Sequence, residues 1–220
     1  MIHLVISDTH IGDRQSNKNL PKLFTLLEDY SKKENCNLVL NGDIFDFAKT
    51  LAFDERHRIF LSLIQKYENV TYIEGNHDWF VSGLRDVLPI SFKKCVLLKL
   101  ENKIIRISHG HQTDRMVMNM PKLNRFLVKI NSWFHDCSGI DVQHAARKTW
   151  LVQKLLLQRQ ENRLIRLEKV ANVVIAGHTH RPCEREYKGI MYYNTGDWVE
   201  KDHCSYVTIS DNSNIELFRA

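Results

Sequence analysis

Histidine, aspartate and asparagine gather at five points along the chain, each directly after a short apolar run. Carboxylate oxygens, an amide oxygen and imidazole nitrogens are the ligands that Mn²⁺, Fe²⁺ and Zn²⁺ prefer in proteins. No cysteine thiolate is among them, which argues against a structural zinc site. The set is too large for one ion and about large enough for two. Its members are Asp8, His10, Asp43, Asn76, His77, His109, His178 and His180.

Two divalent ions held roughly 3.5–4 Å apart are the usual protein device for hydrolysing phosphate esters. The positive charge of two such ions exceeds the negative charge of two aspartates. The site would therefore be net positive, which suits a phosphoryl group. The pattern therefore predicts a hydrolase of a phosphorylated substrate with two divalent metal ions. We expect Mn²⁺, with Fe²⁺, Zn²⁺ or Mg²⁺ as alternatives. Any one cluster taken alone would equally suit a turn or a solvated loop, and the recurrence favours the metal site.

The apolar runs before these clusters are rich in Val, Ile and Leu, which is typical of strands buried on both faces. Apolar residues at helical spacing lie between the first three runs. This alternation predicts parallel strands, and ligands of open α/β sheets bind at the carboxyl ends of such strands. We expect strands at 2–7, 37–40, 70–74, 95–100, 103–108, 173–176, 190–193, 205–210 and 215–218, and helices at 18–33 and 54–67.

The segment 115–170 has a different character. It contains a single glycine, eleven Lys or Arg and four Asp or Glu, so it holds the basic excess of the whole chain. Two or three helices are expected there, with Trp133 and Trp150 on apolar faces. Because the segment lies between two cluster-bearing strands, we predict a helical lid inserted into a single domain that spans residues 1–220. The alternative is an ordinary solvated helical face.

A basic lid with apolar faces suits the anionic and apolar parts of an amphipathic substrate. It suits a phosphodiester as well, but no nucleic-acid-binding motif accompanies it, so we do not expect a nuclease. The predicted substrate-binding residues lie in this segment or beside the clusters. They are Asp114, Arg115, Trp133, Arg147, Lys148, Trp150 and Arg181.

Composition sets the remaining limits. The chain has 220 residues, 43% of them hydrophobic, which suits one domain with its own core. Its five cysteines are scattered and odd in number, which favours a reducing compartment. No apolar run approaches the roughly 20 residues that span a bilayer. The chain enters a strand directly after Met1, so we expect no signal peptide and a cytoplasmic location.

The five motifs resemble those of the calcineurin-like metallophosphoesterases, which are Asp-x-His, Gly-Asp, Gly-Asn-His-Asp/Glu, His and Gly-His-x-His. All five are present here in that order. The resemblance implies an α/β fold, a two-sheet αββα sandwich flanked by helices. It also implies roles for single residues. The first ion would be held by Asp8, His10 and His180, the second by Asn76, His109 and His178, and both by Asp43, with Asn76 and His77 as the catalytic pair.

In that family's pattern His77 would face the substrate, where it would stabilise the transition state or protonate the leaving oxygen. A protein of this fold could also bind other proteins without any metal. The complete ligand set argues against that hypothesis.

Within the family, the chain resembles the branch that includes UDP-2,3-diacylglucosamine diphosphatase of lipid A synthesis. The resemblance rests on His109-Gly110-His111 followed by Asp114, on the inserted segment, on 177–182 and on 194–198. It implies a lid that receives acyl chains and a peripheral contact with the inner membrane face. One departure is that this chain has Asn76-His77 where the best-known members have Asn-Arg. A soluble substrate, such as a nucleotide, a cyclic nucleotide or a phosphoprotein, is therefore the alternative.

Overall fold

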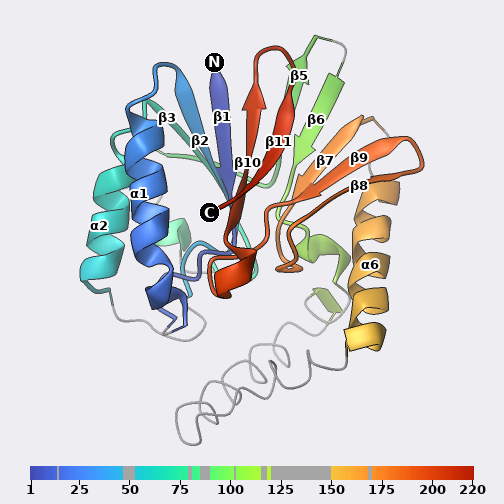
Figure 1. Ribbon diagram of the computed structural model, residues 1–220, viewed down its shortest axis with the longest axis horizontal. Coiled ribbons are helices and arrows are strands. Elements are labelled where there is room, and N and C mark those ends of the chain that lie inside the picture. Colours follow the sequence, from blue (N-terminus) through green and yellow to red (C-terminus); the bar gives the residue numbers. More distant parts are fainter. Residues whose placement is uncertain are drawn as a thin grey trace, which may run out of the picture.

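Two β-sheets face each other in the computed structural model (Figure 1). The structure describes residues 1–13, 15–46, 53–78, 81–84, 90–101, 103–114, 118–119, 150–167 and 170–220. The first sheet has the order β11 (Ile215–Arg219), β10 (Ser205–Ser210), β1 (Ile2–Ile6), β2 (Cys36–Asn41), β3 (Asn69–Ile73) and β4 (Ser91–Lys93). The second has the order β5 (Val96–Leu100), β6 (Lys103–Ile107), β7 (Val173–Ala176), β9 (Ile190–Asn194) and β8 (Cys183–Tyr187).

Strand direction places the carboxyl ends where the sequence predicts them. β1, β2, β3 and β4 run parallel, and β10 and β11 close the sheet in antiparallel fashion. In the second sheet, β6, β7 and β9 are parallel to one another, while β5 and β8 pair antiparallel at the two edges. Five of the parallel strands, β1, β2, β3, β6 and β7, are the ones that precede the polar clusters.

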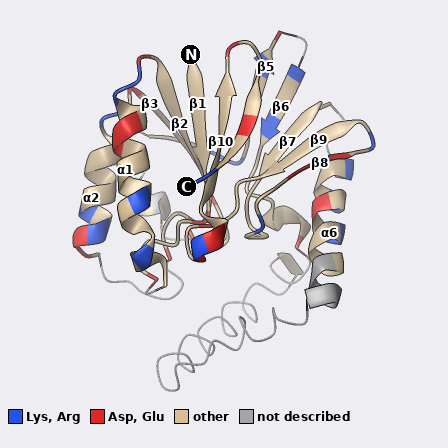
Figure 2. Cartoon of the chain, viewed as in Figure 1, with Lys and Arg blue, Asp and Glu red and all other residues tan. Residues whose placement is uncertain are grey.

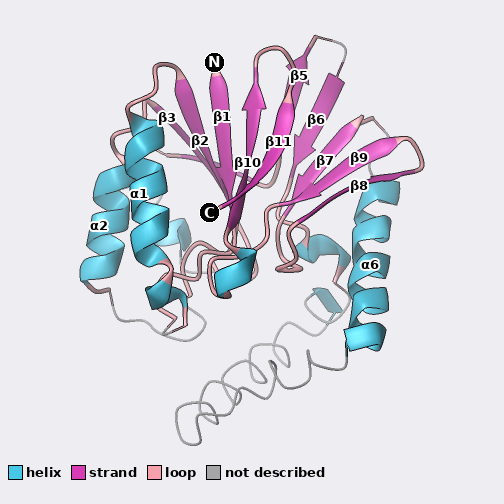
Figure 3. Ribbon diagram, in the orientation of Figure 1, coloured by secondary structure: helices cyan, strands magenta, loops and turns pink. Residues whose placement is uncertain are grey.

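Helices cover the outer faces of both sheets, as Figure 3 shows. α1 (Leu20–Ser31) and α2 (Glu55–Ile64) lie against the first sheet, and α6 (Trp150–Leu167) lies against the second. The backbone N–H of Arg56 donates to the Asp54 side chain, which caps the start of α2. Figure 2 shows acidic and basic residues along α1, α2 and the described part of α6. The predicted two-sheet sandwich is confirmed.

Successive side chains of each strand point to opposite faces of its sheet, which produces three apolar layers. On β1, Leu4 and Ile6 face the helices, whereas Val5 faces the second sheet. On β7, Ile175 packs between the sheets, whereas Val174 packs under α6. Strands buried on both faces are rich in apolar residues, which is why β7 is apolar throughout and β1 is apolar except at His3.

Two strands and part of the inserted segment differ from expectation. β4 and β8 were not predicted, because β4 has three residues and β8 alternates with charged residues. α6 falls within the predicted lid, yet Leu164 and Ile165 are buried against the second sheet. The C-terminal half of α6 therefore belongs to the helical layer that covers the second sheet. The parts of the predicted lid at 115–117, 120–149 and 168–169 lie outside the described residues, so the lid and its boundaries stay a prediction.

Two further findings concern the described residues. Cys36, Cys95, Cys183 and Cys204 are free thiols. Among the helices that the structure describes, none combines the length and apolar character that a membrane span requires.

The layer between the sheets should contribute strongly to stability. Ile175 is 0% exposed there, so Ile175→Ala should lower the free energy of unfolding by about 2–5 kcal/mol, because it removes buried methyl groups and leaves a cavity. Leu97 on β5 is 55% exposed, and Leu97→Ala should change the free energy by less than about 0.5 kcal/mol. Urea unfolding followed by circular dichroism measures both. Similar losses in the two variants would contradict this assignment of the core.

Candidate metal centre

The loops after β1, β2, β3, β6 and β7 meet at one end of the sandwich, and the polar clusters lie on them (Figure 1). The first sheet supplies the loops at 7–10, 41–46 and 74–78. The second sheet supplies the loops at 108–111 and 177–180. The sequence-predicted ligands are brought together from both sheets at this end.

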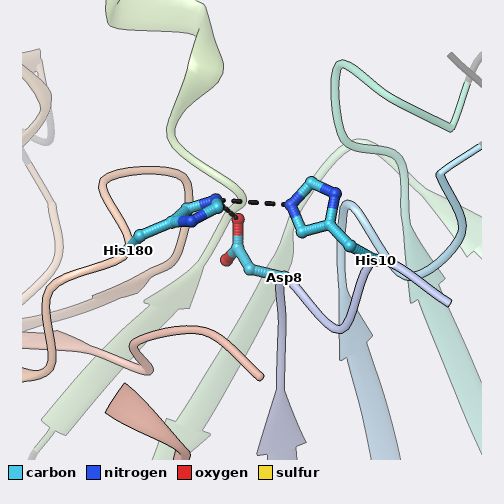
Figure 4. Close-up of side chains that lie close together, drawn as sticks. All are labelled: Asp8, His10 and His180. Atoms are coloured by element: carbon cyan, nitrogen blue, oxygen red, sulfur yellow. Dashed lines mark hydrogen bonds and ion pairs between the residues drawn. The ribbon is translucent and has the colours of Figure 1, made fainter. Parts of the chain in front are cut away.

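One group consists of Asp8, His10 and His180. The Nε2 atom of His180 lies 3.2 Å from Asp8 Oδ1 and 3.3 Å from the Nε2 atom of His10. Figure 4 shows both imidazoles directed toward one carboxylate. Ligand atoms about 2.0–2.2 Å from a shared ion are separated by about 3–3.4 Å in tetrahedral or octahedral geometry. The observed spacing therefore fits donors that share one cation.

A second group consists of Asp43, His109 and His178, whose ligand atoms lie within 4.8 Å of one another. His109 Nε2 is 3.2 Å from Asp43 Oδ2. Asn76 stands in the neighbouring loop, and its Oδ1 atom is buried without a hydrogen-bond donor in the structure. A buried acceptor with no donor is costly unless a cation or other partner satisfies it. The donor set therefore fits a second divalent ion.

The outward nitrogens of three histidines have partners that fix the ring orientation. His109 Nδ1 donates to the carbonyl oxygen of Asn41 at 2.8 Å. His10 Nδ1 lies 3.4 Å from Asp46 Oδ2, and His180 Nδ1 lies 3.5 Å from Asp197 Oδ2. In each case Nε2 is directed into the site. Histidine ligands of metals commonly have such a carboxylate or carbonyl behind them, which makes the ring a better ligand.

The backbone of the site is held in an unfavourable conformation. Five of the seven predicted ligands have left-handed φ angles, namely 52° at Asp8, 44° at His10, 52° at Asp43, 66° at His178 and 58° at His180. Such conformations of non-glycine residues cost energy and cluster at functional sites. Tight packing accompanies them, because a Cβ on Gly177 would lie 2.2 Å from Asp8 Oδ2.

Buried carboxylates dominate the electrostatics. Burial alone would lower the pKa of His109, but the Asp43 and Asp8 carboxylates raise it to about 10. Burial opposes ionisation of Asp43 as well, and the surrounding histidines nevertheless hold its pKa well below the usual value. Burial and the Asp43 charge raise the pKa of Asp78 to about 6. The site is thus built to attract positive charge.

Three carboxylates at the site were given no role by the sequence analysis. Asp46 lies between His10 and His77, with its Oδ1 atom 3.0 Å from His77 Nδ1. Asp78 accepts hydrogen bonds from four backbone N–H groups, including those of Asp43 and Gly75, and so shapes two of the ligand loops. Asp197 stands behind His180. A signal was present for Asp46, which follows Gly42-Asp43 by three residues, but an aspartate in a loop usually reads as a turn residue.

The predicted substrate-binding residues are only partly described. Asp114 belongs to the site, since its Oδ2 atom lies 3.3 Å from His178 Nε2. Arg181 follows the last ligand and is partly exposed. Trp150 begins α6, but its side chain lies outside the described residues. Arg115, Trp133, Arg147 and Lys148 lie outside them as well.

Residues 3–182 match the family described as Calcineurin-like phosphoesterase. The chain belongs to the calcineurin-like phosphoesterase family. The matched residues include both sets of converging side chains and the loops that carry them. Members of this phosphoesterase family normally bind divalent metal ions, and the two groups described above are the candidate ligands.

Two curated relatives of this chain are DNA polymerase II small subunits. That of Thermoplasma acidophilum is 23% identical over 88% of this chain and 44% of its own length. That of Methanothermobacter thermautotrophicus is 22% identical over 87% of this chain and 46% of its own length. The chain thus spans less than half of these relatives. A solved phosphoesterase structure from E. coli is 16% identical, covers 99% of this chain and 98% of its own, and has a TM-score of 0.49.

A single added methyl group should test the packing of the metal-binding loops. Gly177→Ala places a carbon against the Asp8 carboxylate and should weaken Mn²⁺ binding at least about tenfold, because Asp8 must move. Gly83→Ala is the matched control, since nothing lies within 4 Å of a Cβ there. Isothermal titration of metal-free protein gives both affinities. Unchanged binding in Gly177→Ala would show that Asp8 takes no part.

Proposed function

We propose that the chain hydrolyses phosphoester or diphosphate bonds with two divalent ions, most simply Mn²⁺. Asp8, His10 and His180 would hold the first ion. Asn76, His109 and His178 would hold the second, and Asp43 would serve both. The observation that carries the proposal is that carboxylate oxygens and histidine Nε2 atoms from loops of both sheets converge. They lie 3.2–3.3 Å from one another. Metal analysis of Mn²⁺-loaded protein should find about two ions per chain.

When bound, the ions polarise the phosphoryl oxygens and lower the pKa of a water molecule. The chain's own groups supply orientation and proton transfer. Asp46 holds Nδ1 of His77, so Nε2 is the nitrogen that donates to a phosphoryl oxygen or to the leaving oxygen. The backbone N–H of His77 donates to Asp43 Oδ1 at 2.8 Å, which ties this histidine to the predicted bridging ligand. His77 and Asn76 are therefore the proposed catalytic residues.

A cleft of about 530 Å³ beside the metal centre supports an amphipathic anionic substrate. Near the centre it is lined by Gly75 and His111, and two cations, Lys94 and Arg106, also line it. Its other lining residues include the apolar Met118, Leu164 and Leu167. This combination suits a substrate with an anionic head and an apolar tail.

We propose a UDP-diacylglucosamine-like lipid precursor as that substrate, with the predicted lid receiving acyl chains and the protein acting at the inner membrane face. The resemblance of the motifs to the UDP-2,3-diacylglucosamine diphosphatase branch supports this choice. His77, which stands where that branch has arginine, favours the alternative of a soluble phosphoester.

The catalytic role of His77 has a direct test. His77→Ala should keep both metal ions and lose about 10²–10⁴-fold in kcat, because a positioned acid or base typically contributes that much. Metal content and turnover of a p-nitrophenyl phosphate ester are measured on the same preparation. Full activity in the variant would remove His77 from the mechanism, and loss of metal would make it a ligand.

The substrate proposal is tested on α6. Leu167 lines the cleft and is 62% exposed, so Leu167→Asp should lower kcat/KM for the diacylated substrate at least about tenfold, because each buried CH₂ contributes about 0.8 kcal/mol. Turnover of a small p-nitrophenyl ester should be unchanged. Leu97→Asp, at a position 55% exposed on β5 and outside the residues that line the cleft, is the control and should affect neither substrate. If wild-type protein does not prefer the acylated to the deacylated substrate, the soluble-phosphoester alternative replaces the lipid proposal.

A further inference from the structure

A buried polar network lies beneath the loop at 177–180, which we call the metal loop. Thr179 occupies its middle, between the two histidines, and is buried. The Thr179 hydroxyl accepts a hydrogen bond from Asn194 Nδ2 at 3.1 Å and donates one to Glu161 Oε1 at 3.1 Å. Asn194 also donates to the carbonyl oxygen of Gly177 at 2.8 Å. The metal loop is thus held from below by β9 and by α6.

Glu161 is an unusual partner, because it is a carboxylate only 5% exposed on a helix from the inserted segment. Its second oxygen accepts a hydrogen bond from Arg185 Nη2 at 3.0 Å. A buried carboxylate persists as an ion only when a cation and hydrogen-bond donors compensate it. Arg185 supplies the charge and Thr179 supplies the hydroxyl, so Glu161 offers Thr179 a charged acceptor, which makes the stronger kind of hydrogen bond.

The packing around this network leaves the metal loop little room. One turn beyond Glu161, Leu164 is buried in the cluster that contains Val174 and Ala176 of β7, the strand leading into the loop. The cavity left between α6 and the loop measures about 10 Å³, which is about the size of one water probe. Movement of the loop would therefore break the contacts with α6.

The metal loop needs such support, because both of its histidines are strained. His178 has a φ of 66° and His180 a φ of 58°, and Thr179 lies between them with its N–H donating to Gly177 O at 2.7 Å. Residues in this conformation keep it only when their surroundings hold them. A hydrogen bond to the middle residue restrains both histidines at once.

We propose that Glu161 is a positioning residue that acts through Thr179 to hold the metal loop in the conformation that binds both ions. Glu161 acts through another residue, since its contact is with the Thr179 hydroxyl between one predicted ligand of each metal. The described helix α6 therefore takes part in building the metal centre. This inference rests on the proposed metal site for its effect on binding, and on the contacts of Thr179 for its effect on the loop.

Two measurements on four variants test the proposal. Thr179→Val and Glu161→Gln should weaken Mn²⁺ binding about 10–100-fold, the usual loss when a residue behind the ligands is changed. Thr179→Ser keeps the hydroxyl and should stay within about threefold of wild type. Arg166→Ala is the matched control, because Arg166 also joins α6 to β8, through the Tyr187 hydroxyl, but does not reach the metal loop. Isothermal titration gives the affinities.

The second measurement is amide hydrogen exchange by NMR on the metal-free proteins. The His178 N–H, which donates to Asp8, and the Thr179 N–H should exchange at least about tenfold faster in Thr179→Val and Glu161→Gln, and at the wild-type rate in Thr179→Ser and Arg166→Ala. Unchanged exchange in Thr179→Val and Glu161→Gln overturns the positioning role, whatever the metal affinity. If the two variants exchange faster but the wild-type protein binds none of Mn²⁺, Fe²⁺, Zn²⁺ and Mg²⁺, the positioning role is supported and the proposed function is refuted.

Discussion

Two carboxylates buried at the end of an apolar sandwich are the constraint that the rest of the structure serves. Asp8 and Asp43 are almost completely inaccessible to water, and an ionised group in that position must be compensated by donors or cations. The protein supplies both. The His178 N–H from the second sheet donates to Asp8 of the first at 3.0–3.1 Å, so the site also joins the two sheets. The left-handed turns and close glycines are the geometry that this arrangement requires.

The sequence predicts the strands of this fold better than its connections. A strand covered on both faces is rich in apolar residues, so the mostly apolar sequences of β1, β2, β3 and β7 predict strands. β4 is too short to show a period, and α6, within the predicted lid, packs Leu164 and Ile165 on the second sheet. Local composition cannot tell a helix that covers a sheet from one that covers a site, because both need one apolar face.

For the site, the sequence predicts the residues that point inward and misses those behind them. Ligand types are restricted, so a histidine or aspartate after a buried strand carries information. Asp46 and Asp197 support imidazoles that stand on other loops, and those contacts are set by the fold. Glu161 is harder still, because on its helix it reads as one more exposed charge, and only the fold places it 3.1 Å from Thr179.

The alternation of charged residues along β8 has a further consequence. β8 is the outer strand of the second sheet, and Glu184 and Glu186 are exposed on it. An open sheet edge presents unpaired backbone groups to which any extended chain can add. Arg185 between them is paired with Glu161, so Glu184 and Glu186 leave two negative charges on the exposed face of β8, and a second copy of the same strand would meet like charges there.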